Sequence, residues 1–310
     1  MEYTVKEFKV PSCDGVHQLS AIAYIPSETP KGIFHVVHGM TEYISRYAKI
    51  MSFMAENGYV AVGYDHLGHG HTVNDESELG FIAHKRGWEL LVKDVKVFSD
   101  AVKKEYGESL PYYLMGHSMG SFISRLAAAK YVSPDKLIIM GTGGRNPLAS
   151  VGLALIACLK VIRGERGYSK FLKALAFGSY NKRFGGYDPN DPGKWLTTRE
   201  EIRTKYYGDK LCTFQFTVSA MGDLIRLTKY SNAGSWYKSL DKDLPILIVS
   251  GEDDPVGDYG KGVTAVHNTL KKTGHNSKCI IYKGARHEIL NDISDEAVKK
   301  DIMEFIEGKK

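Results

Sequence analysis

The residues Gly116-His117-Ser118-Met119-Gly120 have the form G-x-S-x-G and are the strongest indication of the fold. A short apolar run, 111–115, precedes it, and a run with helical character, 122–129, follows it. Glycines on both sides of a serine permit a tight strand-to-helix turn that lifts the serine oxygen above the edge of a sheet. The pattern predicts a nucleophilic Ser118 with the N–H of Met119 beside it, and the alternative is an ordinary glycine-rich turn.

A nucleophilic serine needs a histidine base, and three histidines follow it far enough downstream. His267 falls inside an amphipathic helix pattern, and His275 follows a helix-stop signal at 273–274. His287 follows the apolar strand 279–282. Active sites of open α/β sheets gather in loops that leave the carboxyl ends of strands, so His287 is the predicted base.

The carboxylate that orients this base is expected in the turn 251–256, which follows the apolar strand 245–250. Three adjacent carboxylates, Glu252, Asp253 and Asp254, crowd the turn. Only one of them can accept a hydrogen bond from the Nδ1 atom of His287, and spacing alone does not separate Asp253 from Asp254. Asp254 precedes Pro255, which biases its backbone toward an extended form.

A second group that binds a developing oxyanion is expected after the strand 33–37, in His38-Gly39-Met40-Thr41-Glu42. The N–H of Met40 is the natural partner of the N–H of Met119, because two converging amides hold an oxyanion. His38 precedes the serine and belongs to this loop, so it is expected to be structural.

The stretch 65–71, Asp-His-Leu-Gly-His-Gly-His, invites a metal interpretation because three histidines and an aspartate lie close together. It lacks a distant fourth ligand, and its glycines indicate close backbone packing. We therefore expect no metal site and no cofactor.

The 310 residues are enough for one large α/β domain with an insertion. Strands and helices alternate along 1–144 and 231–310, which predicts a mostly parallel sheet covered by helices on both faces. The alternation breaks over 145–230, which is too apolar for disorder and is expected to form a helical cap over Ser118. Most of its large apolar residues are expected to pack against the core and a few to face the pocket: Leu153, Leu155, Ile156, Leu159, Phe171, Leu172, Leu175 and Phe177.

Charge is divided unevenly between these two parts. The segment 145–230 has 15 Lys and Arg against 7 Asp and Glu, whereas the remainder has 26 against 29. A basic, partly apolar element over an active site suits an anionic membrane surface, and a solvated helix face is the alternative. Nucleic acid is not expected as a partner, because no basic stretch carries stacking aromatics in a recognised module.

The four cysteines are scattered, at Cys13, Cys158, Cys212 and Cys279, and are expected to be buried thiols in a reducing compartment. The first residues have neither a basic region nor an apolar region of the kind found in signal peptides. The apolar stretch 151–159 is too short to span a bilayer. These features lead us to expect a cytoplasmic protein.

Taken together, the motifs resemble the α/β-hydrolase superfamily and, within it, the monoacylglycerol lipase and lysophospholipase group. The matching patterns are H-G-x-x-E at 38–42, D-H-x-G-H-G at 65–70, G-H-S-M-G at 116–120, G-x-x-D at 251–254 and the pair His287-Glu288. The resemblance implies a fold with a helical cap, Asp254 as the acid of a Ser118–His287 triad, and Met40 and Met119 as oxyanion donors. The segment 195–198 resembles a cap segment of bacterial lysophospholipase-like members, although Thr197 stands where they usually have serine.

This resemblance implies a serine carboxylester hydrolase that cleaves single-acyl lipid esters, such as monoacylglycerols or lysophospholipids, through an acyl-enzyme. One alternative is a short-chain or aryl carboxylesterase. A serine aminopeptidase is another, although it would need an acidic cluster for the substrate's amino group and the cap is basic. A non-catalytic binding protein of the same fold would normally have lost a member of the triad.

Overall fold

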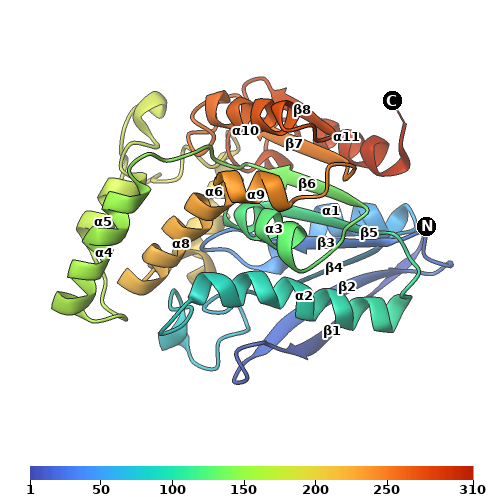
Figure 1. Ribbon diagram of the computed structural model, residues 1–310, viewed down its shortest axis with the longest axis horizontal. Helices are drawn as coiled ribbons and strands as arrows, with labels where there is room; N and C mark the ends of the chain where they lie inside the picture. Colours follow the sequence, from blue (N-terminus) through green and yellow to red (C-terminus); the bar gives the residue numbers. More distant parts are fainter. Residues whose placement is uncertain (310) are drawn as a thin grey trace.

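The computed structural model describes residues 1–309 and places an eight-stranded sheet at their centre (Figure 1). The spatial order of the strands is β1-β2-β4-β3-β5-β6-β7-β8. β2 pairs antiparallel with both β1 and β4, whereas all neighbours from β4 to β8 pair in parallel. The strands are β1 (Tyr3–Pro11), β2 (Gln18–Pro26), β3 (Ile33–Val37), β4 (Val60–Tyr64), β5 (Tyr112–His117), β6 (Lys136–Met140), β7 (Ile246–Gly251) and β8 (Ser277–Tyr282).

Helices cover both faces of this sheet, as the sequence predicts. On one face lie α1 (Ala48–Glu56) and α11 (Asp295–Glu307), and on the other lie α2 (Gly87–Tyr106), α3 (Met119–Lys130) and α10 (Lys261–Lys272). Each face has its own apolar cluster, so every residue of β3, β4, β5 and β7 is buried. Short 3-10 helices span Ile44–Tyr47, Glu76–Glu78, Lys182–Phe184 and Ile289–Asn291.

The chain between β6 and β7 is helical. It forms α4 (Ala149–Arg163), α5 (Lys170–Phe177), α6 (Glu200–Gly208), α7 (Lys210–Thr213), α8 (Val218–Ser231) and α9 (Gly234–Ser239). α8 packs against both α3 and α4, whereas α4 and α5 lie at one end of the molecule, away from the sheet (Figure 1). Within residues 1–309, none of the helices has the length and apolar character needed to cross a membrane.

One buried arginine of α3 contacts the chain on both sides of the segment 145–230, which we name the insertion. Arg125 donates hydrogen bonds to Thr142, before the insertion, and to the Ser231 carbonyl and the Asn232 side chain after it. Its guanidinium also lies 4.3 Å from the ring centre of Trp236, and burial lowers the pKa of Arg125 to about 10. Both stems of the insertion are therefore fixed to the helix that follows Ser118.

Two expectations about the insertion are wrong. Cys158 is exposed, and so are Phe171 and Leu175, whose exposed fractions are 61% and 65%. The physical reason is that α4 and α5 bury only part of their apolar surface, with Ile156 and Leu172 turned inward. We use the name α4–α5 surface for a set of exposed residues on these two helices, which consists of the apolar residues Val161, Ile162, Phe171 and Leu175 and the basic residues Arg163, Lys170 and Lys173.

Candidate active site

Ser118 forms the whole turn between β5 and α3. β5 ends at His117 and α3 begins at Met119, and Ser118 between them has a φ of 53° and a ψ of −119°. A Cβ on Gly120 would lie 2.0 Å from the Val37 carbonyl oxygen, so β3 and α3 approach this closely only because the position is glycine. The positive φ of Ser118 is a strained conformation for a residue other than glycine, and such strain is characteristic of functional sites.

His287 and Asp254 meet at the carboxyl ends of the strands. Nδ1 of His287 lies 3.0 Å from each carboxylate oxygen of Asp254, which is fully buried and also accepts the Val256 N–H at 2.8 Å. The neighbouring Asp253 instead points outward, with a side chain that is 37% exposed and 4.0 Å from Arg183. The geometry therefore distinguishes the two aspartates that spacing alone left open.

The other two downstream histidines make different contacts. Nδ1 of His267 lies 3.0 Å from the Ser277 hydroxyl, and Nε2 of His275 lies 3.2 Å from the Leu240 carbonyl. The ring of His117, which precedes Ser118, has its centre 4.8 Å from that of His287.

Within residues 1–309 no hydrogen bond joins the Ser118 hydroxyl to His287, and such bonds commonly tighten only when substrate binds.

The loop 38–42 passes directly against the serine. A Cβ on Gly39 would lie 3.0 Å from the Cβ of Ser118. In the described part of the chain, the N–H groups of Met40 and Met119 make no hydrogen bond, so both remain able to bind an anion. Thr41 has a φ of 53°, and its carbonyl accepts a hydrogen bond of 2.9 Å from Tyr206 of α6.

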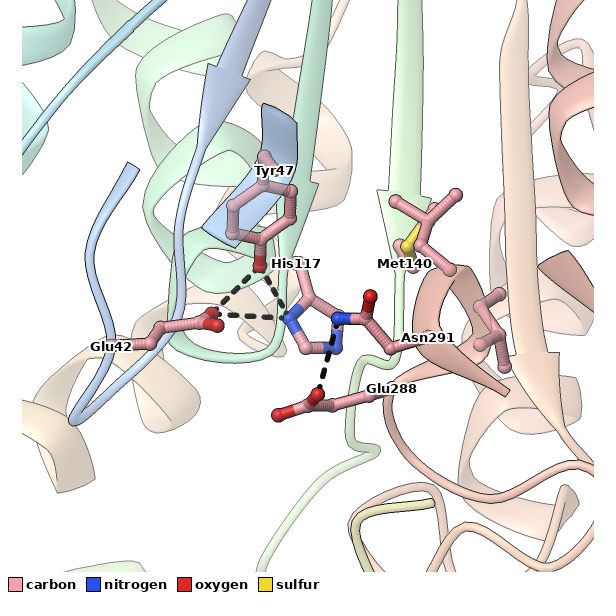
Figure 2. Close-up of a pocket in the computed structure, with 8 residues that line it drawn as sticks. Glu42, Tyr47, His117, Met140, Glu288 and Asn291 are labelled. Atoms are coloured by element: carbon pink, nitrogen blue, oxygen red, sulfur yellow. Dashed lines mark hydrogen bonds and ion pairs between the residues drawn. The ribbon is translucent and has the colours of Figure 1, made fainter. Parts of the chain in front are cut away.

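A buried carboxylate joins this loop to the serine turn. Glu42 accepts hydrogen bonds from the Gly39 N–H at 2.5 Å, from Tyr47 at 2.7 Å and from Arg46 at 2.9 Å, and it lies 3.3 Å from Nδ1 of His117. Figure 2 shows Glu42, Tyr47 and His117 turned toward one another. One side chain thereby fixes the loop that precedes Met40 and the residue that precedes Ser118.

Arg46 extends this network to the loop that carries His287. It donates two hydrogen bonds to Glu288, of 3.0 and 2.8 Å, while it remains paired with Glu42. Glu288 directly follows His287, so the loop 38–42, the turn at Ser118 and the loop that carries His287 are held by one buried set of charges. Two carboxylates that share one guanidinium need a further cation to balance their charge.

His117 is positioned to supply that cation. Burial alone would lower the pKa of His117, but the hydrogen bond and charge of Glu42 outweigh burial and raise it. Burial likewise opposes ionisation of Glu42, but His117 and Arg46 hold the pKa of Glu42 far below its usual range. Both shifts favour an ion pair between Glu42 and a protonated His117.

A small cavity lies beside this pair (Figure 2). Its volume is about 10 Å³, which is room for about one water molecule, and Glu42, Glu288 and Asn291 are among the residues that line it. It is too small for a substrate, so it is part of the support behind Ser118.

The histidines at 38, 66 and 69 form a second buried group, which includes the first residue of the loop 38–42. Nε2 of His38 accepts the His66 N–H at 3.0 Å, so its Nδ1 donates to the Gly39 carbonyl. Burial lowers the pKa of all three rings, which are therefore neutral. Across residues 1–309, no group of three or more His, Cys, Asp and Glu side chains has metal-binding geometry.

The structure brings two of the predicted residues, His287 and Asp254, into direct contact, and it shows two features around them that the sequence analysis did not predict. The charged network was missed, although Glu42 and Glu288 both stand within the motifs. The contact of Trp195 with His287, whose rings are tilted by 40° with centres 5.1 Å apart, was also missed. The segment 195–198 stood out only through its resemblance to a cap segment, which assigned no role to the tryptophan.

Comparisons with known proteins show the family to which this chain belongs. A family model described as serine aminopeptidase, S33 (Hydrolase_4) matches residues 28–294. Monoglyceride lipase of Mus musculus is 32% identical over 282 residues, which are 87% of this chain and 80% of the relative. Phospholipase YtpA of Bacillus subtilis is 24% identical over 290 residues, which are 90% of this chain and 96% of the relative.

A solved structure gives the same result. The carboxyl esterase of Bacillus coagulans, a highly thermostable protein solved in complex with glycerol, superposes with a TM-score of 0.90 at 32% identity. The superposition covers 98% of each chain.

The Glu42–His117 pair predicts a pH-dependent stability. With the pKa of Glu42 lowered and that of His117 raised, the contribution of the pair is full between roughly pH 4.5 and 6.5 and declines as pH rises through the raised pKa of His117. We expect Glu42→Gln to lower the free energy of unfolding by about 3 kcal/mol near pH 5.5, and by less near pH 9. Urea unfolding at several pH values measures this difference, with the exposed Glu56→Gln as the matched control. An unchanging loss from pH 5.5 to 9 would show that His117 is not the partner that titrates.

Proposed function

The chain belongs to the Hydrolase_4 family of α/β-hydrolases and is a carboxylic ester hydrolase, and we propose that Ser118, His287 and Asp254 form its catalytic triad. The observation that carries this proposal is the pairing of a fully buried Asp254 with Nδ1 of His287. The ring of His287 also lies 4.8 Å from the ring of His117, the residue that precedes Ser118 in its strained turn. An aspartate at Nδ1 leaves Nε2 as the nitrogen that receives the serine proton.

In the proposed reaction, Ser118 attacks the ester carbonyl while His287 takes its proton. Asp254 fixes the tautomer of the imidazole and stabilises the imidazolium that forms. The N–H groups of Met40 and Met119 bind the oxyanion of the tetrahedral intermediate. His287 then protonates the leaving alkoxide, and a water molecule hydrolyses the acyl-enzyme by the same steps in reverse. No cofactor takes part in this sequence.

We propose single-acyl lipid esters, monoacylglycerols or lysophospholipids, as the substrates. Two relatives support this class, since one is named a monoglyceride lipase and the other a phospholipase. The aminopeptidase description of the family is less well supported as an activity, because an acidic cluster would be needed to bind a substrate's amino group. The segment 145–230, which we interpret as the cap, instead carries 15 basic against 7 acidic residues.

We further propose that the α4–α5 surface contacts anionic membranes. It combines exposed apolar side chains such as Val161, with an exposed fraction of 88%, and Phe171 with the exposed cations Lys170 and Lys173. Apolar residues that enter a lipid interface beside cations that face anionic head groups are typical of interfacial helices. The acyl substrate would then be taken from the surface where it resides.

The first test of this function is replacement of the nucleophile. Ser118→Ala should lower ester turnover by a thousandfold or more, because only binding and oxyanion effects remain. The fold should persist, since the hydroxyl packs against no apolar core. A fluorophosphonate probe should label the parent protein at Ser118, and continued labelling of Ser118→Ala would refute the assignment.

The second test compares the two aspartates in matched substitutions. Asp254→Asn should lower kcat by several powers of ten, because the amide donates to Nδ1 and enforces the wrong tautomer. Asp253→Asn should change kcat little, because its side chain faces solvent and Arg183. Steady-state kinetics on both variants measure this, and equal losses would mean that the triad acid is misassigned.

The third test concerns the α4–α5 surface. Binding to anionic vesicles should weaken steeply as salt rises, since the Debye length is only about 8 Å at ~0.15 M ionic strength. Lys170→Glu combined with Lys173→Glu should abolish most of this binding and leave turnover of a soluble ester unchanged. The same charge change on α10, Lys271→Glu with Lys272→Glu, is the matched control. Equal co-sedimentation with neutral and anionic vesicles would contradict the proposal.

A further inference from the structure

The imidazole of His287 has two aromatic neighbours that come from different parts of the fold. The ring of His117, at the end of β5, is centred 4.8 Å away with an interplanar angle of 41°. The indole of Trp195, in the segment that precedes α6, is centred 5.1 Å away at 40°. These two rings form much of the immediate surroundings of the base.

His117 alone is an unfavourable neighbour for a second cation. Its pairing with Glu42 favours its protonated form, and a charge at this distance repels any positive charge that develops on His287. His287 acquires such a charge in the proposed reaction each time it takes the serine proton. The face of a tryptophan has the opposite effect, because its quadrupole attracts a cation within about 6 Å of the ring centre.

The position of Trp195 is fixed by the loop that carries His287. The His287 N–H donates to the Trp195 carbonyl at 3.4 Å, and the Glu288 N–H donates to the Leu196 carbonyl at 2.7 Å. Arg286 also donates to the carbonyl of Lys194. The backbone on both sides of the tryptophan is therefore tied to the histidine loop.

A third aromatic residue fixes the indole itself. Tyr180 meets Trp195 edge to face, with ring centres 4.9 Å apart at 69°. Edge-to-face pairs at this separation are favourable and limit rotation of both rings. The indole is thus held between Tyr180 and His287.

We propose that Trp195 is a positioning residue, which orients the imidazole of His287 and stabilises the imidazolium formed during ester cleavage. The inference rests on the proposed function and assigns a part in it to the segment between β6 and β7. It makes that segment necessary for the chemical step as well as for covering the site.

The test compares a substitution that removes the aromatic face with one that keeps it. With a soluble short-chain ester, Trp195→Leu should lower kcat by about 3- to 30-fold and leave KM unchanged, because the lost interaction exists only when His287 is charged. Trp195→Phe should recover most of kcat. Trp88→Leu, the same change at another half-buried tryptophan, should have no effect on kcat.

A boronic acid gives an independent measurement. It forms a tetrahedral anion on the serine next to a protonated histidine, so it mimics the charged state of the reaction. Butylboronic acid should bind Trp195→Leu more weakly by the same factor by which kcat falls. If Trp195→Leu does not fold, Trp195→Met serves as the non-aromatic variant.

The outcomes separate this inference from the function on which it rests. Equal kcat losses in the leucine and phenylalanine variants, or a change confined to KM, would overturn the role of the aromatic face. Full activity of Trp195→Leu beside an inactive Ser118→Ala would overturn the inference alone. Full activity of Ser118→Ala would overturn the proposed function itself.

Discussion

The carboxylate of Glu42 is the interaction on which the rest of the site depends. It accepts hydrogen bonds from the Gly39 N–H in the loop 38–42, from Tyr47 and from Arg46. It also pairs with His117, the residue before Ser118. A buried carboxylate costs several kcal/mol to desolvate unless each oxygen has partners, so these groups must stay together. Arg46 bonds both Glu42 and Glu288. The loop 38–42, the turn at Ser118 and the loop that carries His287 are therefore fixed relative to one another, although they come from distant parts of the sequence.

This arrangement also explains why the serine turn can hold its strained backbone. Ser118 has a positive φ, as does Thr41 in the oxyanion loop, and such residues persist only where their surroundings over-determine them. His117 is fixed by Glu42 on one side of the turn, and α3 is seated against β3 through Gly120 on the other. The strain is thus balanced by contacts on both sides of the residue that bears it.

Much of this could be predicted from sequence, and the remainder could not for identifiable reasons. Ser118 and His287 could be predicted from local sequence, because Ser118 lies in a turn flanked by glycines and His287 lies in a loop that follows a strand. Asp254 was not separable from Asp253 by spacing, because the difference between them is burial and direction. The contact of Arg46 with Glu288 joins residues 242 positions apart, which no local pattern records. In α4, nearly every residue is apolar, so periodicity could not indicate which side faces solvent.

The clamp made by Arg125 has a consequence for how such a protein can change. Because one side chain fastens both stems of the helical insertion to α3, the separation of those stems is set by the core and not by the helices between them. A loop whose ends are already held together loses little further entropy when its length alters. The helices at the outer end of the insertion could therefore be exchanged or changed in length, and the distance from β6 to β7 would stay the same.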